Sequence, residues 1–256
     1  MTRLGRSMAE NLFRMLASLA VVWALVGSPP GHATDYGKFE EFTLYAKDGE
    51  TASEFKADVI VTLHGFGSAM PNRTYKIFYK AFHETHTVVG FNYDYVDVDR
   101  DKVELEELYD KFLRGRNLII VGTSLGGFWA NYFANTVAAR GAILVNPVVD
   151  PQRLMRDMQG EHYSERREKT FRVIEKDAAA YEGVKPTVNP RTEMLVLLTR
   201  DDEVLPYEEA VRTFAGSPTT ETVIFATGGH SPRLDRPDMM SVIRRFVTAH
   251  SGPDEN

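Results

Sequence analysis

The chain has 256 residues, no cysteine and a formal net charge of −6 at pH 7, with 43% hydrophobic and 26% charged residues. This composition is typical of a globular protein with a sizeable core, and it leaves no basic surplus for binding nucleic acid, which we do not expect as a partner. The absence of cysteine excludes disulfides, zinc–thiolate sites, iron–sulfur clusters and a thiol nucleophile.

The N-terminus has the three parts of a secretory signal peptide. Arginines within the first 14 residues precede an uncharged apolar run at 15–26, and small residues at 31–33 offer a cleavage site. The run is shorter than the roughly 20 residues of a membrane span. The pattern predicts a signal peptide at 1–33, export to the periplasm or the exterior, and no stable membrane span after processing. An uncleaved N-terminal anchor, or a cytoplasmic protein that starts at Met8 or Met15, are the alternatives.

From residue 39 onward, short runs rich in β-branched residues alternate with segments of helical periodicity. Strands are predicted at 39–47, 59–63, 87–91, 118–121, 142–145, 194–198 and 222–226. Helices are predicted from Pro71 onward and at 103–112, 125–139 and 239–250. This alternation predicts an α/β fold, with a mostly parallel central sheet covered by helices on both faces. We expect residues 34–256 to form a single domain.

The stretch from about 151 to 190 departs from this rhythm, because it is densely charged and no strand is predicted in it. Within it, Phe171, Ile174, Ala178 and Tyr181 would share one face of a helix. We expect a short helical insertion that caps the C-terminal edge of the sheet. A solvent-exposed crossover segment that touches no ligand is the alternative, because runs of charged residues usually lie on the solvent-exposed surface.

The sequence GTSLG at 122–126 lies directly after one predicted strand and directly before a predicted helix. A serine nucleophile must stand clear of the sheet on a tight turn, and Gly122 and Gly126 would allow that turn around Ser124. The backbone N–H of Leu125 would then face the developing oxyanion. The motif therefore predicts a nucleophilic serine, and a glycine-rich packing turn is the alternative.

A second loop, HGFGS at 64–68, follows the first strand of the predicted core. An oxyanion hole needs a further N–H donor from another loop, and the Phe66 amide is our candidate, with Gly65 beside it. We expect a structural role for His64, whose ring would hydrogen-bond the loop. Ser68 is expected to stabilise the turn, and a hydrogen bond to the substrate is the alternative role.

The acid and the base of a triad are predicted after the last two strands. His230 follows two glycines beyond the final strand, and Asp201, Asp202 and Glu203 follow the strand before it. The order nucleophile, acid, histidine along the chain is typical of serine hydrolases with a strand-to-helix nucleophile turn. Consecutive carboxylates rarely converge on one ion, so we predict no metal site here.

Over residues 59–250 these motifs resemble the α/β-hydrolase superfamily, and more narrowly a group of small bacterial esterases. The shared features are the HGFGS loop, the GTSLGG turn, Asn146-Pro147, the DEVL acid loop and a Gly-Gly-His ending. In such hydrolases the acid commonly stands four residues before a proline, here Pro206, which favours Asp202 over Asp201 and then Glu203. This chain departs from the pattern in its long N-terminal extension and in lacking an asparagine just before His230.

The resemblance implies hydrolysis of small-molecule carboxylic esters or acyl thioesters without a cofactor. It implies Ser124 as nucleophile, Asp202 as acid, His230 as base, and the Phe66 and Leu125 amides as oxyanion donors. Two alternatives stay open. One is another acyl chemistry on the same triad, such as acyl transfer or peptide cleavage. The other is a non-catalytic binding module, because the fold alone does not entail function.

Overall fold

The computed structural model describes residues 43–47, 51–94, 96–188 and 191–252. The predicted signal peptide lies outside these ranges. The strands are β1 (Thr43–Ala46), β2 (Asp58–Leu63), β3 (Thr87–Asn92), β4 (Asn117–Thr123), β5 (Gly141–Val145), β6 (Gly160–Ser164), β7 (Lys169–Val173), β8 (Glu193–Thr199) and β9 (Thr220–Phe225). The helices are α2 (Arg73–Phe82), α3 (Val98–Leu108), α4 (Leu125–Thr136), α5 (Pro151–Asp157), α6 (Glu175–Ala180), α7 (Tyr207–Phe214) and α8 (Pro237–His250), with a 3-10 turn η3 (Ala52–Glu54) and a π-helical turn η4 (Tyr109–Leu113).

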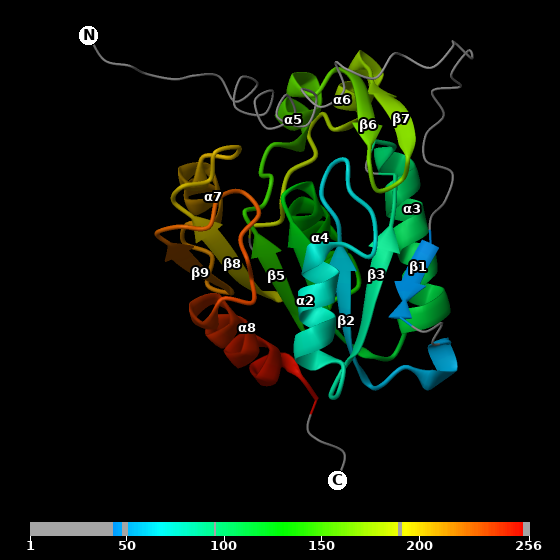
Figure 1. Cartoon of the computed structure of the whole chain (residues 1–256), viewed down its shortest axis with the longest axis vertical. Helices are drawn as coiled ribbons and strands as arrows, with labels where there is room; N and C mark the ends of the chain where they lie inside the picture. Colours follow the sequence, from blue (N-terminus) through cyan, green and yellow to red (C-terminus); the bar gives the residue numbers. More distant parts are fainter. Residues whose placement is uncertain (1–42, 48–50, 95, 189–190, 253–256) are drawn as a thin grey trace.

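Seven strands form one sheet in the order β1-β3-β2-β4-β5-β8-β9 (Figure 1). All neighbours pair in parallel except β1, which runs antiparallel to β3 at the edge. Parallel strands need a crossover between them, and the intervening helices supply it. The predicted fold class, a mostly parallel sheet with helices on both faces, is therefore confirmed.

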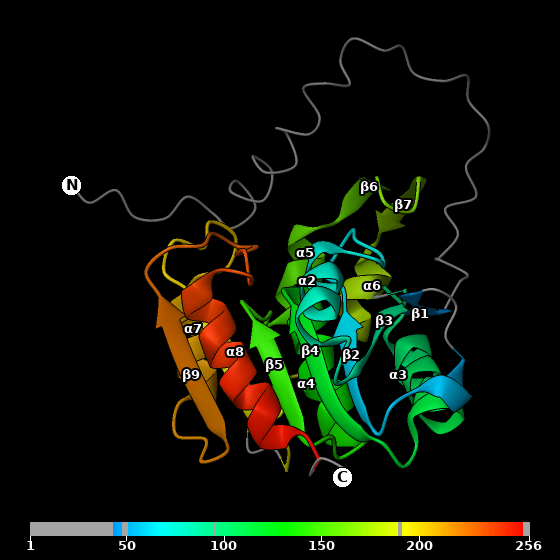
Figure 2. The same ribbon diagram turned by 60° about the horizontal axis from the view of Figure 1, so that its bottom comes forward.

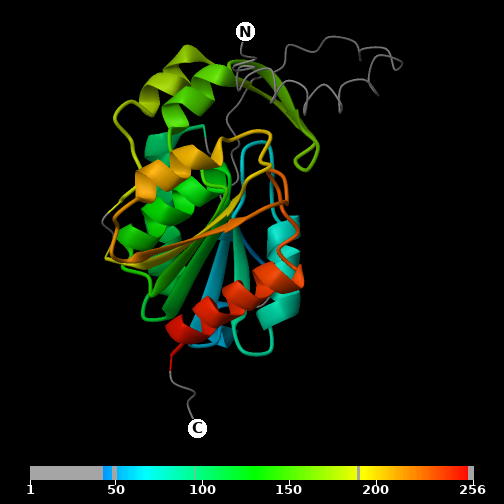
Figure 3. The ribbon, with the colours of Figure 1, turned by 90° about the vertical axis from the view of Figure 1, so that its left-hand side faces the viewer.

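Helices cover both faces of the sheet, with α2 and α8 on one side and α3, α4 and α7 on the other (Figures 2 and 3). Successive side chains of a strand point to opposite faces. In β4, Leu118 and Ile120 accordingly pack with the α4 side, while Ile119 and Val121 pack with α2 and α8. Because both faces are buried, the central strands are continuous apolar runs, which is why the sequence predicts them well.

The start of α2 differs from its prediction. Pro71 was expected inside the first helical turn, but the helix begins at Arg73 and Asn72 is its N-cap. The Asn72 side chain accepts a hydrogen bond from the Tyr75 amide at 2.8 Å, which satisfies one of the unpaired N–H groups at the helix start. The predicted apolar face is present, since Tyr75 and other members of it are buried.

The prediction of a purely helical insertion at 151–190 was wrong. Between α5 and α6, β6 and β7 form an antiparallel hairpin. The predicted helical face is not formed, because Phe171 lies buried in β7 and Ile174 is 47% exposed. Figures 1 and 3 show α5, the hairpin and α6 together beyond the C-terminal ends of the central strands.

Within the described ranges, no helix is both long enough and apolar enough to cross a membrane.

Candidate active site

Ser124 lies on the turn between β4 and α4, with φ 60° and ψ −126°. A positive φ is strained for a residue other than glycine and is held only where the surroundings enforce it. A Cβ on Gly122 would lie 1.9 Å from the Gly126 carbonyl oxygen, and one on Gly126 would lie 2.5 Å from that of Leu63. Glycine is therefore required on both sides of Ser124, because the backbones approach too closely for any side chain.

His230 and Asp202 form a buried pair. The His230 Nδ1 lies 2.9 Å from Asp202 Oδ2 and 3.1 Å from Oδ1, and the two side chains are 8% and 2% exposed. An ionised carboxylate only accepts hydrogen bonds, so Nδ1 carries the proton and Nε2 is left as the basic nitrogen. The amides of Val204 and Leu205 each donate to Asp202 Oδ1 at 2.8 Å, which fixes the carboxylate.

Ser124 and His230 line the same cleft, which has a volume of about 260 Å³. The cleft lies at the C-terminal ends of the strands, where ligands bind in open α/β sheets. Its lining residues are Gly65, Phe66, Ser68, Asn72, Arg73, Thr74, Thr123, Ser124, Arg166, His230, Ser231 and Pro232. Leu125, whose amide is the other expected oxyanion donor, is the first residue of α4.

The two carboxylates beside Asp202 accept hydrogen bonds from the backbone of the loop between β9 and His230, which we call the histidine loop. Asp201 Oδ1 accepts from the Gly229 amide at 2.9 Å, and Glu203 Oε2 accepts from the His230 amide at 3.0 Å. Hydrogen bonds from the backbone amides lower the pKa of Asp201. Of the three candidates for the acid, Asp202 is the one whose carboxylate contacts the histidine ring.

His64 lies behind the cleft and is fully buried. Its Nδ1 donates to the Gly65 carbonyl oxygen at 2.9 Å, its Nε2 accepts from Arg167 Nη2 at 3.0 Å, and its ring stacks on Tyr93. Burial, and secondarily the charge of Arg167, lower the pKa of His64 to about 3. The ring is therefore neutral and holds its loop in place, which is the structural role expected of it. The loop approaches Ser124 closely, since a Cβ on Gly65 would lie 3.4 Å from the Ser124 Cβ.

A comparison with protein-family models matches residues 59–231 to an uncharacterised protein family, UPF0227. The chain belongs to this family. The matched range runs from β2 to the residue after His230, so it includes the nucleophile turn, the acid loop and the histidine loop. No match to a curated protein was found.

Solved structures resemble this UPF0227 member in fold. Est1E from Butyrivibrio proteoclasticus is 14% identical, with a TM-score of 0.56 over 80% of this chain and 90% of that chain. Alpha/beta hydrolase domain-containing protein 10 from mouse is 16% identical, with a TM-score of 0.56 over 81% and 92%. A monoacylglycerol lipase from Paleococcus ferrophilus is 15% identical, with a TM-score of 0.56 over 82% and 100%. The UPF0227 chain thus has the α/β-hydrolase fold.

Arg167, in the turn between β6 and β7, is a site residue that sequence reasoning missed. Besides the His64 ring, its Nη2 donates to the Tyr93 carbonyl oxygen at 2.7 Å. The hairpin also packs against the Phe66 ring, which meets His162 and Phe171 edge-on at 5.2 and 5.4 Å between ring centroids. No motif signals this role, because Arg167 lies in a charge run that resembles a solvated surface.

Asn146 has a role that its place in the Asn-Pro motif did not reveal. Its Nδ2 donates to the Thr199 hydroxyl and to the carbonyl oxygens of Gly229 and His230, each at 3.0 Å. Its Oδ1 accepts from the Thr199 amide at 3.0 Å. One buried side chain thereby joins β5, β8 and the histidine loop, and it fixes the backbone that carries the His230 ring.

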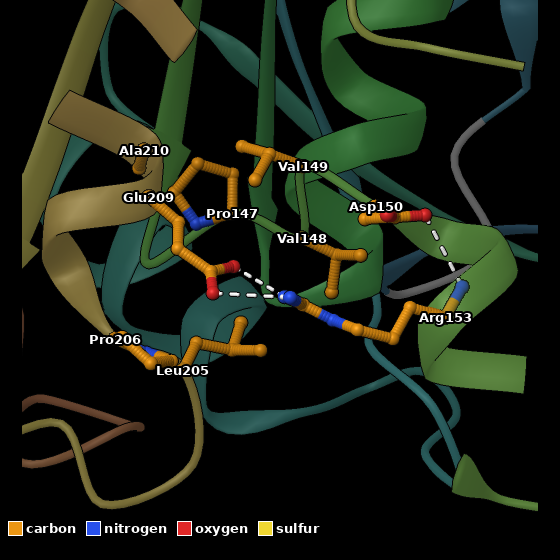
Figure 4. A pocket seen from close by; sticks show the side chains of 9 residues that line it. All are labelled: Pro147, Val148, Val149, Asp150, Arg153, Leu205, Pro206, Glu209 and Ala210. Carbon is orange, nitrogen blue, oxygen red and sulfur yellow. Dashed lines mark hydrogen bonds and ion pairs between the residues drawn. The ribbon is translucent and has the colours of Figure 1, made fainter. Parts of the chain in front are cut away.

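A second pocket of this UPF0227 protein is too small for a substrate. It has a volume of about 10 Å³ and lies where α5 meets the start of α7 (Figure 4). The Arg153 guanidinium crosses it to form an ion pair with Glu209, and Asp150 caps α5 by accepting from the Arg153 amide. This volume holds about one water molecule, so the pocket is a packing gap between α5 and α7, which the Arg153–Glu209 ion pair connects. Among the described residues, no cluster of three or more histidines and carboxylates could hold a metal ion.

Proposed function

We propose that this protein is a serine hydrolase that cleaves carboxylic ester or acyl-thioester bonds through an acyl-enzyme on Ser124. One observation carries the proposal: a serine on a strained strand-to-helix turn shares a cleft with His230, whose Nδ1 lies 2.9 Å from a buried Asp202 oxygen. Proteins of similar fold include one described as an esterase and one described as a monoacylglycerol lipase, which agrees with this chemistry.

In the proposed reaction, Ser124 Oγ attacks the acyl carbonyl carbon while His230 Nε2 takes the hydroxyl proton. Asp202 keeps the imidazole in the Nδ1–H tautomer and stabilises the imidazolium that forms. The tetrahedral intermediate collapses, and His230 gives the proton to the leaving alcohol or thiol. Water then attacks the acyl-enzyme, His230 takes the water proton and returns it to Ser124 Oγ, and the carboxylic acid leaves.

The Phe66 and Leu125 amides are proposed as the oxyanion hole. The first N–H groups of a helix have no partner within it, and the helix dipole favours negative charge at that end, so the Leu125 amide suits this role. The loss of one such donor typically costs about 3 kcal/mol of transition-state stabilisation. The proposed mechanism uses only groups of the chain and water, and it requires no cofactor.

The competing possibilities differ in what they predict. Acyl transfer or peptide cleavage would use the same acyl-enzyme with another acceptor or another acyl donor. A non-catalytic binding module would have an unreactive Ser124.

Replacement of Ser124 by alanine tests the proposal. We expect purified protein to hydrolyse aryl esters or acyl thioesters of graded chain length, and Ser124→Ala to lose that turnover by several orders of magnitude, because the acyl-enzyme cannot form. A fluorophosphonate probe should label the unaltered protein but not Ser124→Ala. Thr136→Ala, a substitution on an exposed residue of the same helix, is the matched control and should be labelled like the unaltered protein. Wild-type turnover in Ser124→Ala, or the absence of both labelling and turnover in the folded unaltered protein, would contradict the proposal.

A further inference from the structure

The charged side chains that line the cleft are positive. Among its lining residues, Arg73 and Arg166 carry full positive charges and none is an aspartate or glutamate. The carboxylate nearest to the chemistry, Asp202, is buried behind the His230 ring and pairs with it. A ligand in the cleft therefore meets two guanidinium groups without a competing carboxylate in the lining.

Neither guanidinium charge is neutralised by a neighbouring carboxylate among the described residues, so both can attract an anionic ligand. Arg73 donates to the Ser231 carbonyl oxygen, next to His230, and Arg166 Nη1 donates to the Pro71 carbonyl oxygen at 3.2 Å. These partners are neutral, and an arginine has five N–H donors. Within the described ranges, neither arginine has an ion pair, whereas Arg153, Arg233 and Arg236 each pair with a carboxylate.

Two helix N-termini add to the positive potential. α2 begins at Arg73 and α4 begins at Leu125, directly after Ser124. Each terminus is equivalent to roughly half a positive charge. The arginines and the helix ends thus have the same sign, and they lie at the cleft that the proposed reacting serine also lines.

The lining is not predominantly apolar. Its uncharged side chains are mostly hydroxyls and an amide, from Ser68, Asn72, Thr74, Thr123 and Ser231, while Phe66 and Pro232 are its apolar members. A long acyl chain would displace water from these polar groups without replacing its hydrogen bonds, which disfavours a neutral lipid as substrate.

We infer that the cleft selects an ester or thioester whose acyl or alcohol portion carries an anionic group, a carboxylate or a phosphate, that Arg73 and Arg166 bind beside the scissile bond. This inference rests on the proposed function and names the substrate class of the same site. Arginine forms paired hydrogen bonds with both kinds of anion, so either is compatible with the site.

Matched charged and neutral esters test the inference. For the alcohol portion, the set is 4-(butanoyloxy)benzoate, its methyl ester and 4-(butanoyloxy)phenyl phosphate. For the acyl portion, the pair is mono-4-nitrophenyl adipate and its methyl ester. We expect kcat/KM to be roughly tenfold higher for the anionic member of at least one set, mainly through a lower KM, because charge-assisted hydrogen bonds form at a partly exposed site. The preference should shrink as salt is added.

Variants that remove one positive charge test whether Arg73 and Arg166 cause the preference for anionic esters. Arg166→Gln and Arg73→Gln should each reduce the ratio of anionic to neutral kcat/KM by roughly threefold or more, while Arg73→Lys keeps most of it. Arg172→Gln, on an exposed residue of the same hairpin that does not line the cleft, should leave the ratio unchanged. Equal kcat/KM for charged and neutral esters in every set, with turnover that still depends on Ser124, would overturn the inference and leave the proposed function standing. Absence of turnover with every ester and of probe labelling would instead overturn the proposed function.

Discussion

At the scale of single residues, three consecutive carboxylates accept hydrogen bonds from His230 or from the glycine before it. Asp202 contacts the His230 ring, Glu203 accepts from the His230 amide, and Asp201 accepts from the amide of Gly229. A catalytic ring must be held within a fraction of an ångström of its productive position. The neighbours of the proposed acid therefore position the backbone that carries the proposed base, while Asp202 alone of the three touches the ring.

Substitution of Asp202 by asparagine separates these roles. We expect Asp202→Asn to lower kcat for ester hydrolysis by roughly three to four orders of magnitude, because an amide cannot hold the Nδ1–H tautomer or stabilise the imidazolium. Steady-state kinetics on an aryl ester measure this fall.

Asp201→Asn is the matched control, since an asparagine Oδ1 can still accept from the Gly229 amide. We expect a much smaller fall in kcat. A larger fall in Asp201→Asn than in Asp202→Asn would show that the acid has been assigned to the wrong residue.

The spacing to Pro206 predicts Asp202 as the acid, but the sequence does not reveal what Asp201 and Glu203 contact. Their partners are backbone amides whose directions depend on the dihedral angles of the histidine loop. Gly228 and Gly229 have φ values of 158° and 63° there. A glycine pair allows many such conformations, so the direction of each N–H becomes known only when the fold is known.

At the scale of elements, the β6–β7 hairpin completes the site from outside the sheet. Its Arg167 reaches the His64 ring and the Tyr93 carbonyl, and its Ser164 hydroxyl donates to the Gly67 carbonyl at 3.0 Å. The loop that is expected to supply an oxyanion amide is thus held by a segment about 100 positions later in the chain. Contacts of this kind leave no periodic signal in the sequence.

The hairpin was mistaken for helix because its apolar residues are few. In β7, Phe171 and Val173 are buried and Arg172 between them is exposed, whereas Lys169, on the same face as Phe171, is exposed. The alternation of a strand is therefore too short to be recognised. Ala178 and Tyr181 continue an apparent helical spacing into α6. Short apolar runs of this kind are ambiguous between strand and helix, whereas the buried strands of the main sheet are not.

Arg167→Met tests the link between the hairpin and the site. Methionine keeps an unbranched apolar stem but loses the donors to the His64 ring and to Tyr93, so the His64 loop should become less ordered. We expect kcat to fall by roughly tenfold or more, with a smaller change in KM, because an ill-placed oxyanion donor weakens the transition state more than the bound substrate.

Arg172→Met, on an exposed residue of the same hairpin, is the control and should keep wild-type kinetics. Thermal unfolding of both variants separates a local effect from a loss of fold. A wild-type kcat in folded Arg167→Met would show that the hairpin does not order the site.

At the scale of the whole molecule, two buried groups make stability depend on pH in opposite directions. The pKa of His64 is lowered to about 3, so its neutral form stabilises the fold above pH 6.5 and this contribution is lost as the pH falls toward 3. The pKa of Asp101 is raised well above 3.8, by burial first and then by the charge of Asp94. Its protonated form stabilises the fold at low pH, and this contribution is lost as the pH rises through the folded pKa.

Asp101 lies in α3 among other acidic side chains. Its Oδ1 accepts from the Asp94 amide at 3.0 Å, and Glu104 and Asp97 also raise its pKa. The guanidinium of Arg100 nearby pairs with Glu104 and lies 4.0 Å from an Asp94 oxygen. Ionisation of Asp101 would therefore place another negative charge in a buried acidic cluster, which is unfavourable.

Asp101→Asn should make the protein more stable than the unaltered chain at neutral pH, by an amount that grows as the pH rises. Asparagine cannot ionise, and its Oδ1 can still accept from the Asp94 amide. Between pH 3.8 and the folded pKa, the difference in unfolding free energy should increase by up to about 1.4 kcal/mol per pH unit. Urea unfolding of both proteins at a series of pH values measures this difference, and the His64 contribution cancels in it.

Asp99→Asn, on an exposed residue of the same helix, is the control and should follow the wild-type curve of unfolding free energy against pH. Parallel curves for Asp101→Asn and the unaltered protein would show that Asp101 ionises in the fold at its ordinary pKa.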